Sequence, residues 1–149
     1  MSASDAFESD LLKLIFNNTT IATLGDVTGV VGSGAAGSVF VALHTADPTD
    51  AGNQSSNEAT YTGYARVAVA RSSGSWSVSG TSPTTVSNLA AVTFGACTAG
   101  SNTITHFSLG YATSGATKII VSGALTASLA VSAGITPNFA IGALTATCD

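Results

Sequence analysis

Ionisable side chains are scarce in this sequence. Only 8% of its 149 residues are Asp, Glu, Lys or Arg, whereas a typical soluble domain contains about 25%. Small residues and hydroxyls take their place, and the mean hydropathy is +0.42. Because a free monomer usually relies on charge to stay soluble, this composition predicts a chain whose surface is largely covered by neighbours in an assembly.

The few charges that remain exclude several classes of partner. Four Lys and Arg residues against eight Asp and Glu residues give a net charge of −4. Phosphate binding requires clustered cations, so we expect no nucleic-acid partner and no membrane partner. No apolar run reaches the roughly 18–20 residues of a membrane span. The acidic N-terminus also lacks the basic region of a secretory signal, so we predict synthesis in the cytoplasm without export by that route.

Cysteine and histidine are equally rare, with two residues of each. Cys97 and Cys148 fit neither a metal knuckle nor a disulfide framework. We favour two unpaired thiols, with a bridge as the alternative if their strands are neighbours. His44 and His106 supply too few ligands for zinc. Serine-hydrolase, zinc-protease and Walker motifs are missing, and we therefore expect no enzyme activity, no metal and no cofactor.

Two weak motifs invite ligands that we do not expect to bind. The run 32–37 matches the dinucleotide fingerprint in form. However, the VFVALH that follows it predicts a strand, where the fingerprint requires a helix. The acids of the 45–60 loop invite calcium, but the spacing of an EF-hand loop is absent. One hypothesis for function, the third after the two described below, is a small carbohydrate-binding jelly roll with a calcium site in this loop.

Residues 5–17 form the one convincing helix of the sequence. Asp5 can cap its N-terminus, with Glu8 three residues on. An apolar stripe follows at helical spacing, made of Phe7, Leu11, Leu14 and Ile15 and widened by Leu12 and Phe16. A short isolated helix is unstable in water. The stripe must therefore dock, either on the chain's own β domain or on a neighbouring subunit.

The rest of the chain predicts short strands separated by Gly and Ser turns. The expected strands cover 39–44, 61–71, 76–79, 86–94, 103–111, 118–126, 129–131, 136–140 and 143–148. This pattern is typical of an all-β sandwich or barrel. We predict an antiparallel β-sandwich, jelly-roll-like, preceded by a short N-terminal α-helix. Residues 1–38 would form the helix and a Gly- and Thr-rich arm, and 39–149 the β-sandwich domain.

The stretch 61–71, YTGYARVAVAR, holds two of the four cations, Arg66 and Arg71. The plainest interpretation is a half-buried strand with its arginines in water; the alternative is a counter-ion or a partner. The polar 45–60 loop before it is long enough to suggest a contact role. The candidate partner contacts are therefore Asp47, Glu58 and Arg66 together with the helix stripe Phe7, Leu11, Leu14 and Ile15.

Several segments of the chain resemble a family of small virion proteins of tailed bacteriophages. They are HTADP at 44–48, GYARVAVAR at 63–71, AVTF at 91–94, THF at 105–107 and the stretch 122–147. The resemblance covers 39–149 well and the helix loosely. It implies a non-enzymatic structural protein, and it transfers no catalytic residue because these motifs mark turns and strands.

Members of that family resemble either capsid cement proteins or tail-fibre-like proteins. Our main hypothesis is a cement (decoration) protein that binds the major capsid protein as a homo-oligomer on the capsid surface of the virion, assembled in the host bacterial cytoplasm. The alternative is a tail or tail-fibre component that contacts tail proteins or a host surface glycan. That alternative would need an exposed aromatic patch, for which Trp76, Tyr61 and Tyr64 are the candidates.

Overall fold

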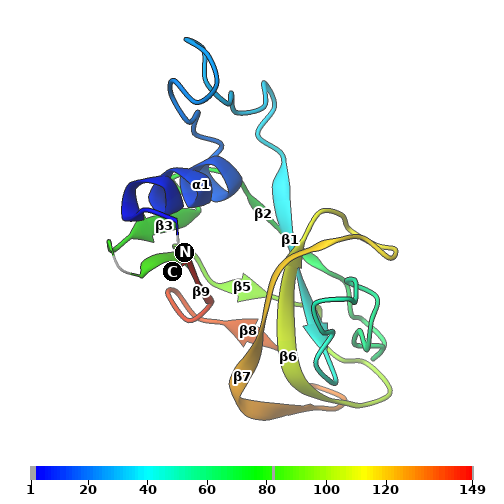
Figure 1. Ribbon diagram of the computed structural model, residues 1–149. Coiled ribbons are helices and arrows are strands. Elements are labelled where there is room, and N and C mark those ends of the chain that lie inside the picture. The colour runs from blue at the N-terminus through cyan, green and yellow to red at the C-terminus, as the bar shows by residue number, and fades with distance from the viewer. Residues whose placement is uncertain (1–2, 82, 149) are drawn as a thin grey trace. The chain divides into compact units, whose positions relative to one another are not determined.

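The computed structural model describes residues 3–81 and 83–148, which are mostly β with one helix (Figure 1). The elements are α1 (Asp5–Asn17), β1 (Ser38–His44), β2 (Val67–Ala70), β3 (Trp76–Ser79), β4 (Thr84–Asn88), β5 (Val92–Thr93), β6 (Asn102–Gly110), β7 (Ile119–Val131), β8 (Asn138–Phe139) and β9 (Thr145–Cys148). Three sheets run in the orders β2-β1-β6-β7, β3-β4-β9 and β5-β8. The pairs β1–β6, β6–β7, β3–β4 and β4–β9 are antiparallel. The predicted all-β antiparallel class with an N-terminal helix is confirmed.

The chain divides into two compact units, each built from segments that are far apart in the sequence. Unit 1 contains the residues up to Ser38, the segment Ala70–Ala91 and the residues from Phe139 on. Unit 2 contains Val39–Val69 and Val92–Asn138. The predicted boundary between 1–38 and 39–149 stays a prediction, because units that are compact by contact need not fold independently.

Helix α1 spans the residues that the sequence predicts, but its cap lies one residue earlier. Ser4 is the N-cap, and its side chain accepts a hydrogen bond from the Phe7 N–H. The predicted cap at Asp5 is wrong because Asp5 already belongs to the first helical turn. The helix ends at Asn17, and its C-cap is Asn18, whose φ of 56° places it in the left-handed region that asparagine tolerates.

In unit 1, α1 packs against β3, β4 and β9 through a face next to the predicted stripe. Its buried residues are Glu8, Leu12 and Phe16. The Phe16 ring meets the Trp76 ring edge-on, with centroids 5.1 Å apart. At 3.6 residues per turn, positions 8, 12 and 16 form a row adjacent to 7, 11 and 15. The helix therefore docks through the two residues that widen the stripe.

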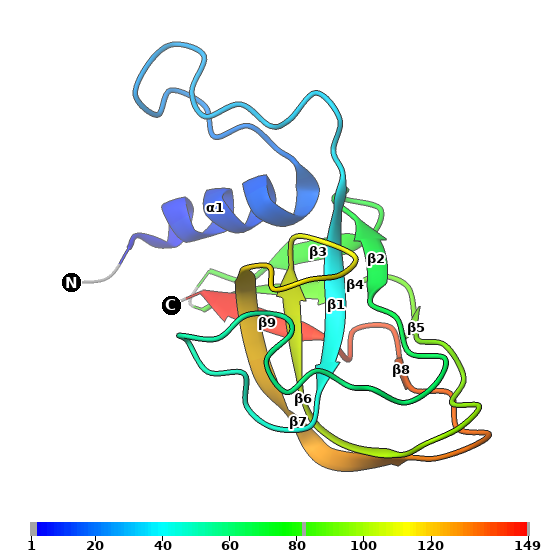
Figure 2. The same ribbon diagram turned by 90° about the vertical axis from the view of Figure 1, so that its right-hand side faces the viewer.

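Unit 2 is organised around β6, which lies between β1 and β7 (Figure 2). The register pairs Ile104 with Leu129 and His106 with Ala124. Four residues of β7, 125–128, therefore stand opposite the single residue Thr105. This bulge joins the two strands predicted at 118–126 and 129–131. Because β7 is an edge strand without a single charge, the bulge also discourages edge-to-edge pairing there.

Two other predicted strands are shorter in the structure. The strand predicted at 61–71 shrinks to β2, because a turn closed by the Tyr64 N–H to the Tyr61 carbonyl at 3.1 Å precedes it. Gly63, with a φ of 103°, gives this turn the backbone geometry that glycine favours. The strand predicted at 86–94 divides into β4 and β5, since the Asn88 side chain donates to the Ala90 carbonyl at 2.7 Å.

Both cysteines carry free thiols in the described chain. Cys97 is buried and Cys148 is half-buried. The favoured prediction of two unpaired thiols is confirmed, so packing and hydrogen bonds, without a covalent cross-link, hold the described chain together.

Candidate functional site

Arg66 is the most strongly bonded side chain of unit 2. It lies directly before β2, and its side chain is only 1% exposed. Its Nε donates to Glu58 Oε1 at 2.6 Å and its Nη2 donates to Glu58 Oε2 at 2.7 Å. This bidentate pairing is the strong form of an arginine–carboxylate bond. The interpretation that places Arg66 in water is wrong, because a carboxylate from the preceding loop neutralises it.

The same guanidinium ties two loops together. It donates to the carbonyls of Ala112 at 3.1 Å and Gly115 at 2.9 Å, both in the β6–β7 loop over 111–118. Gln54 does the same from the 45–60 loop: its Nε2 donates to the Phe40 carbonyl at 2.9 Å, and its Oε1 accepts from Thr117 Oγ1 at 2.9 Å. We name Gln54, Glu58 and Arg66 the clamp. It fixes both loops against the sheet.

Tyr64 supports the clamp from the side of the core. Its hydroxyl donates to Glu58 Oε1 at 2.9 Å and accepts from the Leu43 N–H at 3.1 Å. Burial raises the pKa of Tyr64 far above the ordinary tyrosine value, so the hydroxyl stays protonated. The ring stacks on Phe94 with centroids 6.1 Å apart. Tyr64 is thus a support for Glu58.

The aromatic patch expected for a host-glycan contact does not form at the predicted residues. Trp76 and Tyr61 are buried, and Tyr64 is half-buried beneath the clamp. The Tyr61 hydroxyl donates to the Gly95 carbonyl at 3.0 Å. These three side chains serve their own cores, since a large ring removed from water stabilises the fold more than an exposed one does.

His44 is a second fully buried polar group of unit 2. Its Nδ1 lies 2.8 Å from the Ser56 carbonyl oxygen and its Nε2 lies 2.8 Å from Ser108 Oγ. Because a carbonyl only accepts, the neutral ring carries its proton on Nδ1 and accepts from Ser108 at Nε2. Burial lowers the pKa of His44 below its ordinary value. His44 and His106 are cross-strand partners in the β1–β6 pair, so the predicted adjacency of their strands is confirmed.

The lowered pKa of His44 predicts a loss of stability in mild acid. The unfolded chain takes up this proton near pH 6.5, at about the ordinary histidine pKa, whereas the folded chain resists it. The unfolded state therefore binds more protons, and the free energy of unfolding falls as pH drops below about 6.5. Urea unfolding between about pH 5 and pH 8 measures this slope.

Two glutamine variants identify the titrating group. The slope between about pH 5 and 6.5 should shrink in His44→Gln, which removes the buried imidazole. It should persist in His106→Gln, the cross-strand partner. Equal slopes in the wild type and His44→Gln would show that another group titrates.

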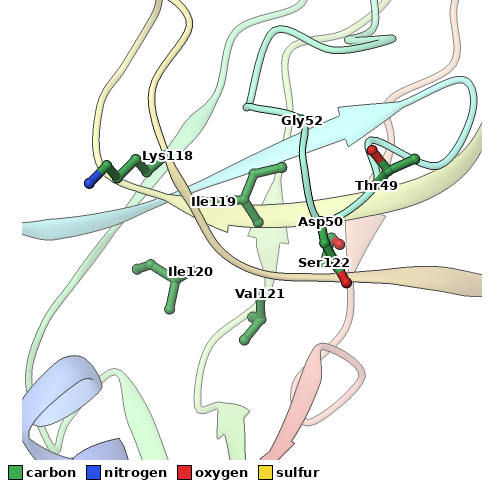
Figure 3. Close-up of a pocket in the computed structure, with 8 residues that line it drawn as sticks. All are labelled: Thr49, Asp50, Gly52, Lys118, Ile119, Ile120, Val121 and Ser122. Atoms are coloured by element: carbon green, nitrogen blue, oxygen red, sulfur yellow. The ribbon is translucent and has the colours of Figure 1, made fainter.

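Unit 2 contains a pocket of about 330 Å³ (Figure 3). Its walls come from the 45–60 loop and from the start of β7, and its lining residues are Thr49, Asp50, Gly52, Lys118, Ile119, Ile120, Val121 and Ser122. A Cβ at Gly52 would lie 1.8 Å from the Pro48 carbonyl oxygen. Only glycine therefore allows the loop to fold this tightly beside the pocket.

Asp47 shapes the same loop from its exposed position. Its Oδ1 accepts from the Thr49 N–H at 2.8 Å, which is an Asx turn. Its carbonyl accepts from the Asn57 side chain at 3.2 Å. The structure thus brings Glu58 and Arg66 into direct contact. It places Asp47 near the start of the 45–60 loop, where it stabilises a turn.

The other four predicted contact residues belong to α1 in unit 1. Phe7 is 39% exposed, and Leu11, Leu14 and Ile15 are half-buried. We name these four residues the outer face of α1. An apolar strip that its own unit leaves partly open is available to a partner.

Arg71, which the sequence did not select as a contact, fixes the end of α1. Its guanidinium donates to the carbonyls of Ile15 at 2.5 Å, Leu14 at 2.6 Å and Ala36 at 3.1 Å. The Leu14 and Ile15 carbonyls lie in the last turn of α1, where the helix itself supplies no partner, and Ala36 lies in the segment before β1. The signal for this role is present in the sequence, since the last turn of α1 contains no basic residue of its own.

Comparison with known proteins gives one family. The sequence model of the family described as Podophage GP4 fiber I protein gp80 matches residues 2–147. No curated protein matches the chain. Within residues 3–81 and 83–148, no three His, Cys, Asp or Glu side chains converge on a site for a metal ion. In the same part of the chain, no helix is long and apolar enough to cross a membrane.

Proposed function

Because the chain belongs to the Podophage GP4 fiber I protein gp80 family and is thus a bacteriophage virion protein, we propose that it is a non-enzymatic component of a tail fibre. The observation that carries the proposal is the family match over residues 2–147. The family's description favours the tail-fibre alternative over capsid cement, the main hypothesis from the sequence. Capsid decoration and homo-oligomer formation stay predictions.

The use of the buried charges supports a structural role without catalysis. Arg66 and Glu58 neutralise each other and fix loops, and Arg71 holds the end of α1. His44 has both ring nitrogens engaged by Ser56 and Ser108. A catalytic acid or base needs a polar atom that is free to meet a substrate, and these groups hold the fold instead.

We further propose that the outer face of α1 binds another virion protein. Phe7 supports this choice, because its aromatic ring is 39% exposed. Aromatic side chains are enriched in the buried core of protein–protein interfaces, so a partner would bury this ring. The clamp residues Glu58 and Arg66 are left out of this surface, since their charges already have partners within unit 2. Their role is to position the loops that bound the pocket.

Phe7→Asp should remove the chain from virions without unfolding it. An acid in the first helical turn favours the helix dipole, so stability should hold, while the charge opposes burial against a partner. We expect occupancy in purified particles to fall on the order of tenfold, the change that about 1.4 kcal/mol produces. Ala6→Asp adds the same charge at the neighbouring exposed position and should keep occupancy; equal incorporation of both variants would contradict the contact.

Copy number distinguishes the fibre from the cement. Quantitative mass spectrometry of purified virions, with the major capsid protein as internal standard, gives the number of chains per particle. A fibre component should be present in a few or tens of copies. Hundreds of copies, in a fixed ratio to the capsid lattice, would overturn the fibre proposal in favour of cement.

A further inference from the structure

Unit 2 contains two charged side chains that its own fold does not use. Its five charged residues are Asp47, Asp50, Glu58, Arg66 and Lys118. Three of them are engaged: Glu58 and Arg66 pair with each other, and Asp47 accepts from a backbone N–H. The exposed side chains of Asp50 and Lys118 have no hydrogen bond or ion pair within the described chain.

Both of these free charges line the same pocket. In the view of Figure 3, Asp50 lies with Ser122 at one end of the lining and Lys118 lies at the other. The aliphatic residues Ile119, Ile120 and Val121 lie between them. A chain with only 8% charged residues thus presents an acceptor, a donor and aliphatic residues together in one lining.

We propose that this pocket binds a neutral saccharide unit of the bacterial surface, an inference that rests on the proposed fibre function. A carboxylate accepts from sugar hydroxyls, an ammonium donates to them, and the hydroxyls of Thr49 and Ser122 do both. The aliphatic side chain of Ile119, which lies between the two charges in Figure 3, suits the C–H face of a sugar ring. The two opposite charges cancel, which matches a ligand without net charge.

Other classes of ligand fit the lining less well. A phosphate or sulfate would be repelled by the Asp50 carboxylate. This repulsion would offset the attraction of the anion to the Lys118 ammonium. A calcium ion needs about six to eight oxygen ligands, and no group of three acidic or other metal-binding side chains converges within the described residues. A wholly apolar ligand would desolvate both charges without pairing them.

The clamp makes the pocket ready before a ligand arrives. The Gln54 N–H donates to the Thr117 carbonyl at 2.9 Å, one residue before Lys118. Arg66 binds the Gly115 carbonyl in the same loop at 2.9 Å and pairs with Glu58 of the 45–60 loop, whose residues Thr49, Asp50 and Gly52 form the opposite wall. These bonds join the two loops that supply the walls, so binding requires little ordering of the protein. The volume of about 330 Å³ lies at the small end of ligand pockets, which fits a short part of a polysaccharide.

The test is NMR titration of the isotopically labelled full chain. The probe is polysaccharide released from the surface of the bacterial strain that the phage infects. We expect amide shifts confined to residues 49–52 and 118–122. Asp50→Asn should weaken binding on the order of tenfold, as loss of a charge-assisted hydrogen bond does. Asp10→Asn removes an exposed acid on α1 and should bind as the wild type does.

Three results would overturn the saccharide site. They are no shifts at these amides, equal weakening by Asp50→Asn and Asp10→Asn, and tighter binding by Asp50→Asn, which indicates an anionic ligand. Failure of the site is distinguishable from failure of the proposed function. A chain found in tail fibres that ignores the polysaccharide overturns the site alone, whereas a chain found on the capsid that binds it overturns the fibre proposal alone.

Discussion

Arg66→Met is expected to lower the free energy of unfolding by about 3–5 kcal/mol, the usual cost of breaking a buried ion pair from one side. The substitution keeps much of the side-chain volume but removes the Arg66 donor from the Ala112 and Gly115 carbonyls and from the Glu58 carboxylate, which still accepts from the Tyr64 hydroxyl. The Glu58 side chain is 18% exposed. Water can therefore hydrate it in part, which places the expected effect toward the lower end of the range.

Lys118→Met is the matched control for this prediction. It makes the same change of residue class and charge at an exposed position without an in-chain partner, and should alter stability by less than about 0.5 kcal/mol. Adding Glu58→Gln to Arg66→Met should recover part of the loss, because the orphaned carboxylate is then neutral. Urea unfolding midpoints of the wild type, the two single variants and the double variant measure these differences. Arg66→Met and Lys118→Met with equal midpoints would contradict the clamp.

Phe16→Ala should cost about 3–5 kcal/mol, as truncation of a buried aromatic residue does. The Phe16 side chain is 0% exposed and packs edge-on against Trp76. A 13-residue helix is marginal by itself, so losing this anchor should free α1 from its sheet. Trp76 is the only tryptophan of the chain, and its fluorescence therefore reports the loss directly.

Phe7→Ala is the comparison that identifies the docked face of α1. Phe7 is 39% exposed, and its replacement by a better helix former should change stability by no more than about 0.5 kcal/mol. If Phe7→Ala destabilised as strongly as Phe16→Ala, the helix would be docked through its outer face. The burial of Leu12 and Phe16 predicts the opposite result.

The extent of α1 could be predicted from the sequence because helical periodicity and capping residues are local signals. Its orientation could not. Phe7, Leu11 and Ile15 form one apolar row and Leu12 and Phe16 the next, and the two rows differ by a single residue around the helix. Which row is buried depends on Trp76 and its sheet, which come together only in the folded unit.

The clamp illustrates the same limit at a polar site. The scarcity of charge selected Glu58 and Arg66 as candidate partner contacts, but it did not predict that they bind each other. Three of the groups that hold Arg66 in place are backbone carbonyls or amide oxygens at Ala112, Gly115 and Gln54. Any residue supplies a backbone carbonyl, so no sequence pattern marks Ala112 and Gly115 as partners of Arg66. The sequence of residues 118–122 predicts only a strand. These residues line a pocket because the folded 45–60 loop lies against them, and no local pattern indicates that contact.

The fibre assignment is tested most directly by electron cryo-microscopy of the intact virion, with this chain traced in the density. We predict that its α1 helix and four-stranded sheet will fit density in a fibre attached to the tail. Density for the chain arrayed over the outer capsid lattice, with none in the tail, would contradict the assignment.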